Sequence, residues 1–161
     1  MEPLIVLIVA FGITLLTAKL IKRAWLYSFA GCFAMSLMLI FTGIGHFLYP
    51  NGMALMLPDF IPYKKELIYL TGVIEIAAAV GLLLPRFRKL TAWSLIIFFI
   101  AILPANIYAA YHHVNLKTAS LDGSGLDYLW FRVPLQILFI AWVYYFGIKK
   151  YKHSIPLYSY K

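Results

Sequence analysis

The segment ELIYLTGVIEIAAAVGLLL, residues 66–84, carries no charged side chain except Glu66 and Glu75. It is about as long as the roughly 20 apolar residues with which a helix crosses the hydrocarbon of a bilayer. Four other apolar runs flank it, at residues 3–18, 24–48, 90–111 and 128–148. Strands of a membrane barrel are about half this long and alternate in polarity. The sequence therefore predicts an all-α polytopic membrane bundle with five crossings, of which the first is the shortest.

The composition supports this fold class. Of the 161 residues, 63% are hydrophobic and only 12% are charged, whereas a soluble domain has about 25% charged residues. A chain this short exposes most of its surface, so that surface must face hydrocarbon. The composition excludes disorder and most soluble enzymes. The single cysteine, Cys32, excludes an intramolecular disulfide and a CxxC redox pair.

The basic residues indicate the orientation of the helices. The formal net charge is +8, and the first connector, the third connector and the tail carry ten Lys and Arg, against three in the second and fourth connectors. Cytoplasmic connectors are enriched in Lys and Arg, so we expect the N-terminus outside and the C-terminus in the cytoplasm. Nucleic acid is excluded as a partner, because the charge lies along one membrane face. The ten are Lys19, Lys22, Arg23, Arg86, Arg88, Lys89, Lys149, Lys150, Lys152 and Lys161.

The second connector, residues 50–65, is too apolar for a solvated loop. We expect it to lie on the outer membrane surface or to cover a cavity.

Glu75 lies near the middle of the third run. A charged, unpaired side chain at that depth costs roughly 2.5–3.5 kcal/mol or more. Its helical neighbours Thr71, Gly72, Ala78 and Ala79 are small, which indicates a face packed against other helices. Such a carboxylate could hold a proton or bind a ligand. The alternative is a structural hydrogen-bond anchor between helices.

Three other runs carry polar side chains in their outer halves. His46 ends the second run and is a candidate proton relay or ligand. Arg132 and Gln136 lie one turn apart in the last run; Arg132 suits a planar anionic or quinone-like group, could pair with Glu75, or could extend to the interface beside Asp127. Asn106 follows Pro104 and either serves a site or satisfies carbonyls that the proline leaves free.

Together these groups predict one polar pocket that opens outward, because hydrogen-bonding groups at similar depth are best satisfied by one another. Within it, Glu75, His46 and Arg132 are the candidate catalytic residues, and Asn106, Gln136 and Thr71 are the candidate ligand-binding residues. No HExxH or Cys/His spacing predicts a metal site. Haem held by His46 with His112 or His113 is disfavoured, since the last two lie in a connector that we expect to be hydrated.

Several short motifs resemble the DoxX family of small bacterial membrane proteins. They are Gly43-Ile44-Gly45-His46-Phe47, Pro58, Ile61-Pro62, Thr71-Gly72 with Glu75, Gly81 with Pro85-Arg86, Leu103-Pro104-Ala105-Asn106 and Arg132 with Pro134 and Gln136. The resemblance implies a four-helix core within residues 23–161, followed by a basic cytoplasmic tail, with residues 1–22 as an extra N-terminal transmembrane helix. It also implies the bacterial cytoplasmic (inner) membrane as the location.

The resemblance implies a subunit or accessory of a membrane redox process, with a quinone-like cofactor or small hydrophobic ligand and an oxidoreductase partner subunit. Whether the chain has turnover of its own is left open by the sequence. An alternative is a non-catalytic assembly or binding subunit, in which polar groups only join helices and the first helix docks a partner or a second copy. The family is also similar to EXPERA-type bundles that bind sterol-like ligands. Transport is not supported, since we find no internal repeat.

Overall fold

The computed structural model describes residues 2–23 and 25–150. Six α-helices and a closing π-helix account for most of them, and the described residues contain no strand, only an isolated bridge between Asn115 and Ser120. The elements are α1 (Glu2–Lys22), α2 (Tyr27–Leu48), α3 (Pro50–Ala54), α4 (Lys64–Leu83), α5 (Arg88–Tyr111), α6 (Asp127–Val143) and η1 (Tyr144–Lys149). The predicted all-α bundle is confirmed. The basic tail residues Lys152 and Lys161 lie outside the described residues.

In the described part of the chain, five helices are long and apolar enough to cross a membrane, as the sequence predicts. The protein is thus a multi-pass helical membrane protein. The spans are Glu2–Ile21, Tyr27–Leu48, Lys64–Leu83, Pro85–Tyr111 and Asp127–Lys149. The first span is not the short helix expected from residues 3–18, because the helix continues through the charged residues at both of its ends, where long polar side chains reach the interface.

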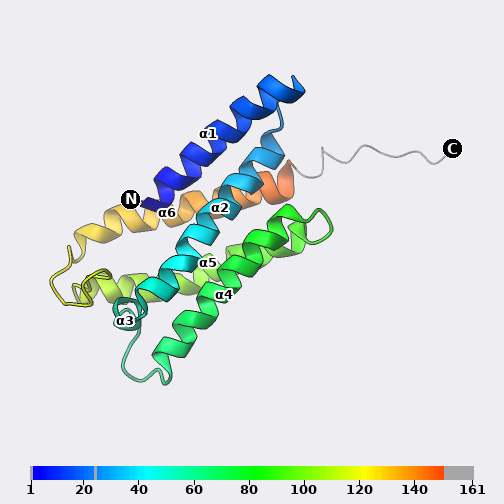
Figure 1. Ribbon diagram of the computed structural model, residues 1–161. Helices are drawn as coiled ribbons and strands as arrows, with labels where there is room; N and C mark the ends of the chain where they lie inside the picture. The colour runs from blue at the N-terminus through cyan, green and yellow to red at the C-terminus, as the bar shows by residue number, and fades with distance from the viewer. Residues whose placement is uncertain (1, 24, 151–161) are drawn as a thin grey trace.

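Successive long helices run in opposite directions (Figure 1). The first and third connectors and the end of η1 lie at one end of the bundle, whereas the second and fourth connectors lie at the other. The N-terminus lies at the second of these ends, since Nζ of Lys117 in the fourth connector is 2.7 Å from Oε1 of Glu2. We call the first the basic end, defined by Lys19, Arg23, Arg86, Arg88, Lys89, Lys149 and Lys150. That it faces the cytoplasm stays a prediction.

The core is apolar and is built mainly from α2, α4, α5 and α6. Met35, Met38, Leu82, Leu95 and Val143 are almost fully buried there. Lipid is as apolar as these side chains, so the hydrophobic effect does not hold the helices together within the membrane. Van der Waals packing of the core side chains does so instead.

The N-terminal helix α1 packs on this core through one face. Leu7 is fully buried, and the ring of Phe11 meets the rings of Trp142 and Phe146 at centroid distances of 4.9 and 5.3 Å. The opposite face of α1 leaves side chains such as Ile13 and Leu16 exposed, as expected for a helix at the lipid boundary.

The apolar second connector folds over the end of the bundle opposite the basic end. It contains α3, and a Cβ added at Gly52 would clash with the carbonyl oxygen of Leu116 in the fourth connector. The two connectors therefore pack directly on each other. Leu55, Leu57 and Asp59 line a pocket of about 160 Å³ together with Tyr108 and His112 of the α5 end, so the segment covers a small cavity.

Candidate functional site

The close approach of α2 and α4 brings two of the predicted site residues together. A Cβ added at Gly72 would lie 2.8 Å from Cβ of His46 and 3.2 Å from the carbonyl oxygen of Gly43. Gly43 of α2 and Gly72 of α4 therefore let the backbones of the two helices approach each other closely, as small residues do in membrane bundles. As a result, Nε2 of His46 lies 3.6 Å from Oε2 of Glu75. The small-residue face predicted around Glu75 is confirmed.

The other side of the His46 ring is held by α4. Its Nδ1 lies 3.0 Å from the carbonyl oxygen of Ile68 and 3.0 Å from Oγ1 of Thr71, which donates to the same carbonyl at 2.8 Å. Because a carbonyl oxygen only accepts, Nδ1 is the donor to Ile68. This hydrogen bond sets the tautomer and the orientation of the ring.

The tautomer determines which group faces Glu75. With a proton on Nδ1, the other ring nitrogen of His46, Nε2, faces the carboxyl group of Glu75. The two side chains thus form an acid–base pair at the contact of two membrane helices.

Glu75 is not fully satisfied by this arrangement. The residue is 5% exposed, and its Oε2 has no hydrogen-bond partner within the part of the chain that the structure describes. The 3.6 Å separation from His46 exceeds the usual hydrogen-bond range. A buried polar atom without a partner is costly and calls for an explanation, such as a bound group.

A second polar cluster joins α5 to α6. Nε of Arg132 donates to Oδ1 of Asn106 at 3.3 Å, Nδ2 of Asn106 donates to Oε1 of Gln136 at 3.3 Å, and Nε2 of Gln136 donates to the carbonyl oxygen of Phe99. Asn106 and Gln136 are buried, and Arg132 is half-buried. Asn106 donates to Gln136 and not to a carbonyl near Pro104. Gln136 is the side chain that donates to the backbone of α5, at the Phe99 carbonyl.

The six predicted site residues thus form two clusters, His46–Thr71–Glu75 and Arg132–Asn106–Gln136. Between residues 2 and 150, Ala24 apart, no hydrogen bond or ion pair joins one cluster to the other. Arg132 donates a hydrogen bond to Asn106 on the adjacent helix α5. Neither of the two expected partners, Glu75 and Asp127, is bound to Arg132. That both clusters line one pocket stays a prediction.

The two other histidines that the structure describes, His112 and His113, have local partners. Nδ1 of His112 lies 3.0 Å from the carbonyl oxygen of Tyr108, whose ring stacks on His112, and Nδ1 of His113 lies 3.3 Å from the carbonyl oxygen of Gly123. Neither contacts His46. Among the described residues, no three His, Cys, Asp or Glu side chains are grouped as metal ligands.

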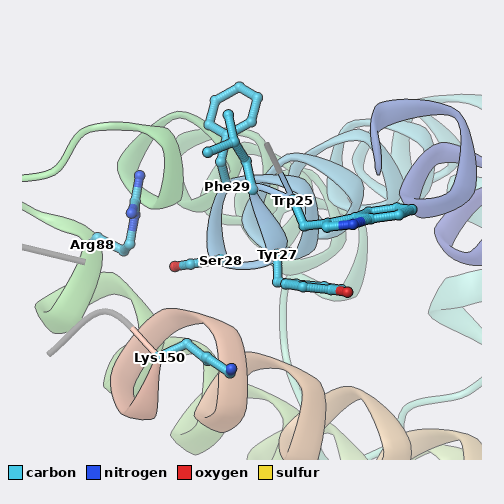
Figure 2. Close-up of a pocket in the computed structure, with 7 residues that line it drawn as sticks. Trp25, Tyr27, Ser28, Phe29, Arg88 and Lys150 are labelled. Carbon is cyan, nitrogen blue, oxygen red and sulfur yellow. The ribbon is translucent and has the colours of Figure 1, made fainter. Parts of the chain in front are cut away.

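Sequence reasoning missed a pocket of about 390 Å³ at the basic end. It is lined by Trp25, which precedes α2, by Tyr27, Ser28 and Phe29 from the first turn of α2, and by Arg88 of α5 and Lys150 (Figure 2). In the sequence, Arg88 and Lys150 indicate only the orientation of the helices. The signal that could have found the pocket is the aromatic run Trp25–Phe29 beside a basic connector.

Comparison with known proteins supports membership of one family. Residues 35–147, which include both polar clusters, match a family described as a domain of unknown function (DUF8561). No curated protein and no solved structure is significantly similar to the chain. The matched segment begins within α2, ends within η1 and does not include α1. The chain therefore belongs to the DUF8561 family.

Proposed function

We propose that this chain is a DoxX-like protein of the bacterial cytoplasmic membrane that binds a quinone-like molecule beside Glu75 and His46 and exchanges a proton with it. In this function it is a subunit or accessory of a membrane redox process, and an oxidoreductase partner handles the electrons. The observation that carries the proposal is Oε2 of Glu75, which is buried and has no hydrogen-bond partner among the described residues.

The pair suits both forms of such a ligand. A quinol hydroxyl is a donor, and Oε2 of Glu75 is the acceptor that it would meet. A quinone carbonyl is an acceptor, and a proton on the carboxyl group of Glu75 or on Nε2 of His46 would supply the donor. When the quinol is oxidised, one hydroxyl proton goes to Oε2 of Glu75, the other goes to bulk water, and the two electrons go to the oxidoreductase partner subunit. General-base work of this kind needs a group within hydrogen-bond reach of the proton.

The second cluster supports binding in a positioning role. Asn106 and Gln136 hold the Nε edge of Arg132 in place. The fixed fork of a guanidinium presents further donors suited to a planar acceptor. In the proposal this cluster orients the ligand, and the acid–base step belongs to Glu75 and His46.

The test is the quinone content of the purified protein. The full chain is extracted from bacterial membranes with mild detergent, and the retained quinone is quantified by mass spectrometry after solvent extraction. Glu75→Gln keeps the shape but removes the proton-binding carboxylate, so we expect at least about a tenfold loss, as for a hydrogen bond to a charged group. Glu66→Gln, on the exposed first turn of α4, is the matched control and should retain quinone.

Equal quinone content in the wild type and Glu75→Gln would overturn the proposal. A sterol-like lipid in place of quinone would favour the EXPERA-type alternative.

The second candidate function is a non-catalytic assembly subunit. The observation in its favour is that Asn106 and Gln136 are partnered across α5 and α6, as expected of groups that only join helices. Native mass spectrometry from mild detergent separates the two functions. A ligand-free chain that co-purifies with another subunit, and whose complex survives Glu75→Gln, supports assembly.

A further inference from the structure

The basic end of the bundle has an excess of positive charge that has no role in the proposed function. It carries Lys19, Arg23, Arg86, Arg88, Lys89, Lys149 and Lys150. The chain has six acidic side chains, and none of them belongs to this end: Glu2, Asp59, Glu66, Asp122 and Asp127 lie at the other end, and Glu75 lies inside the bundle. Such a field attracts an anionic partner.

The pocket of about 390 Å³ lies within this field. Arg88 is only 8% exposed, and its Nε donates to the carbonyl oxygen of Leu82 at 2.8 Å. Since Leu82 is in the last turn of α4, this bond satisfies a carbonyl that the helix end leaves without an intrahelical partner. The guanidinium is thereby held at the pocket wall.

Ser28 and Lys150 form further parts of the wall. Oγ of Ser28 donates to the carbonyl oxygen of Phe146 at 3.1 Å, which ties α2 to the π-helix η1. Figure 2 shows the Ser28 hydroxyl pointing into the gap between Arg88 and the end of η1, which Lys150 follows directly. Nζ of Lys150 lies 5.8 Å from the ring centroid of Tyr27, a cation–π contact that keeps this charge beside the pocket.

The position of the pocket along the membrane spans indicates which class of ligand it suits. Tyr27 is the first residue of its span, Pro85 opens the span that contains Arg88, and Lys149 closes the last span. The pocket therefore lies where the apolar spans end, at the level of lipid headgroups. The rings of Trp25 and Tyr27 stack there at a centroid distance of 6.0 Å, and aromatic side chains favour this interface.

We propose that this pocket is a binding site for the headgroup of an anionic phospholipid. Arg88 and Lys150 contact the phosphate, and the acyl chains lie along the exposed apolar faces beside Phe29, which is 47% exposed. Basic pockets between membrane helices on the cytoplasmic side are known to hold such headgroups. The site is distinct from the Glu75–His46 pair and does not depend on the proposed quinone.

The test uses native mass spectrometry of the full chain in neutral detergent with added phosphatidylglycerol, compared with phosphatidylcholine. We expect wild-type protein to retain one phosphatidylglycerol and no phosphatidylcholine. Lys150→Gln should lower the retained fraction about fivefold, as for the loss of one cation near an anionic surface. Lys89→Gln is the matched control, because it removes the same charge from the same end at an exposed residue that does not line the pocket.

Arg88→Gln is a second variant, with circular dichroism to verify folding, because Arg88 also supports the end of α4. Equal retention of the two lipids, or an equal loss in Lys89→Gln and Lys150→Gln, would overturn the proposal. Displacement of phosphatidylglycerol by inorganic phosphate would also overturn it, because the site would then be one for small anions.

Discussion

Nε2 of His46 lies 3.6 Å from Oε2 of Glu75, and the two residues come from different helices whose backbones meet at glycines. Glu75 is buried and His46 is half-buried, and the far side of the imidazole is fixed by the Ile68 carbonyl at 3.0 Å. The geometry therefore depends on how closely α2 approaches α4. The stability of the pair also depends on both residues, because each side chain is the polar partner of the other.

The closeness of α2 and α4 predicts that Gly72→Ala destabilises the protein. The added Cβ would lie 2.8 Å from Cβ of His46, so the helices must separate, at a cost of about 1–3 kcal/mol as for other overpacked cores. The measurement is thermal unfolding in detergent, followed by circular dichroism. Gly12→Ala is the control, because nothing lies within 4 Å of its Cβ position, and removing a helical glycine there should stabilise α1 slightly. Equal melting temperatures for Gly72→Ala and the wild type would contradict the close packing.

The interdependence of His46 and Glu75 predicts non-additive substitutions. His46→Leu leaves the Glu75 carboxylate buried without its partner, which costs about 3 kcal/mol or more in soluble proteins. The double variant His46→Leu with Glu75→Leu removes both polar groups, and we expect it to be more stable than His46→Leu alone. A double-mutant cycle in denaturant titrations measures the coupling. Strictly additive effects would show that the two side chains do not interact.

The cluster between α5 and α6 predicts a different hierarchy. Asn106 is 2% exposed and bonds to both Arg132 and Gln136, so Asn106→Leu leaves two polar groups without this partner. We expect a loss of about 1–3 kcal/mol. Arg132→Gln removes only one of these bonds, at a half-buried position, and should cost less. The free energies of unfolding of the two variants give the comparison, and the reverse order would contradict the role of Asn106 as the centre of the cluster.

Much of the architecture could be predicted from the sequence, because the length and polarity of each apolar run are local properties. The small face around Glu75 likewise indicated that this residue is inward-facing. Which polar residues meet could not be predicted, since Arg132 reaches Asn106 rather than Glu75 only because α6 packs beside α5. The burial of Arg88 was equally hidden: it depends on the Leu82 carbonyl at the end of another helix, which no local pattern reveals.

At the end opposite the basic end, the ion pair of Asp59 and Lys64 predicts a pH effect. Nζ of Lys64 lies 2.7 Å from Oδ1 of Asp59, and its hydrogen bond and charge hold the pKa of that carboxyl below the ordinary value of 3.8. Because the folded-state pKa is the lower one, the pair stabilises the fold above about pH 3.8, and this contribution is lost as the pH falls through the folded value.

Lys64→Gln should therefore raise the pKa of Asp59 toward 3.8. Carbon-13 NMR of aspartate-labelled protein measures the titration directly. Asp122 serves as an internal reference, because its pKa is lowered mainly by the hydroxyl of Ser120, which this substitution does not touch. If the titration midpoint of Asp59 stays low in Lys64→Gln, a group other than Lys64 lowers its pKa. That outcome would contradict the ion pair of Asp59 and Lys64.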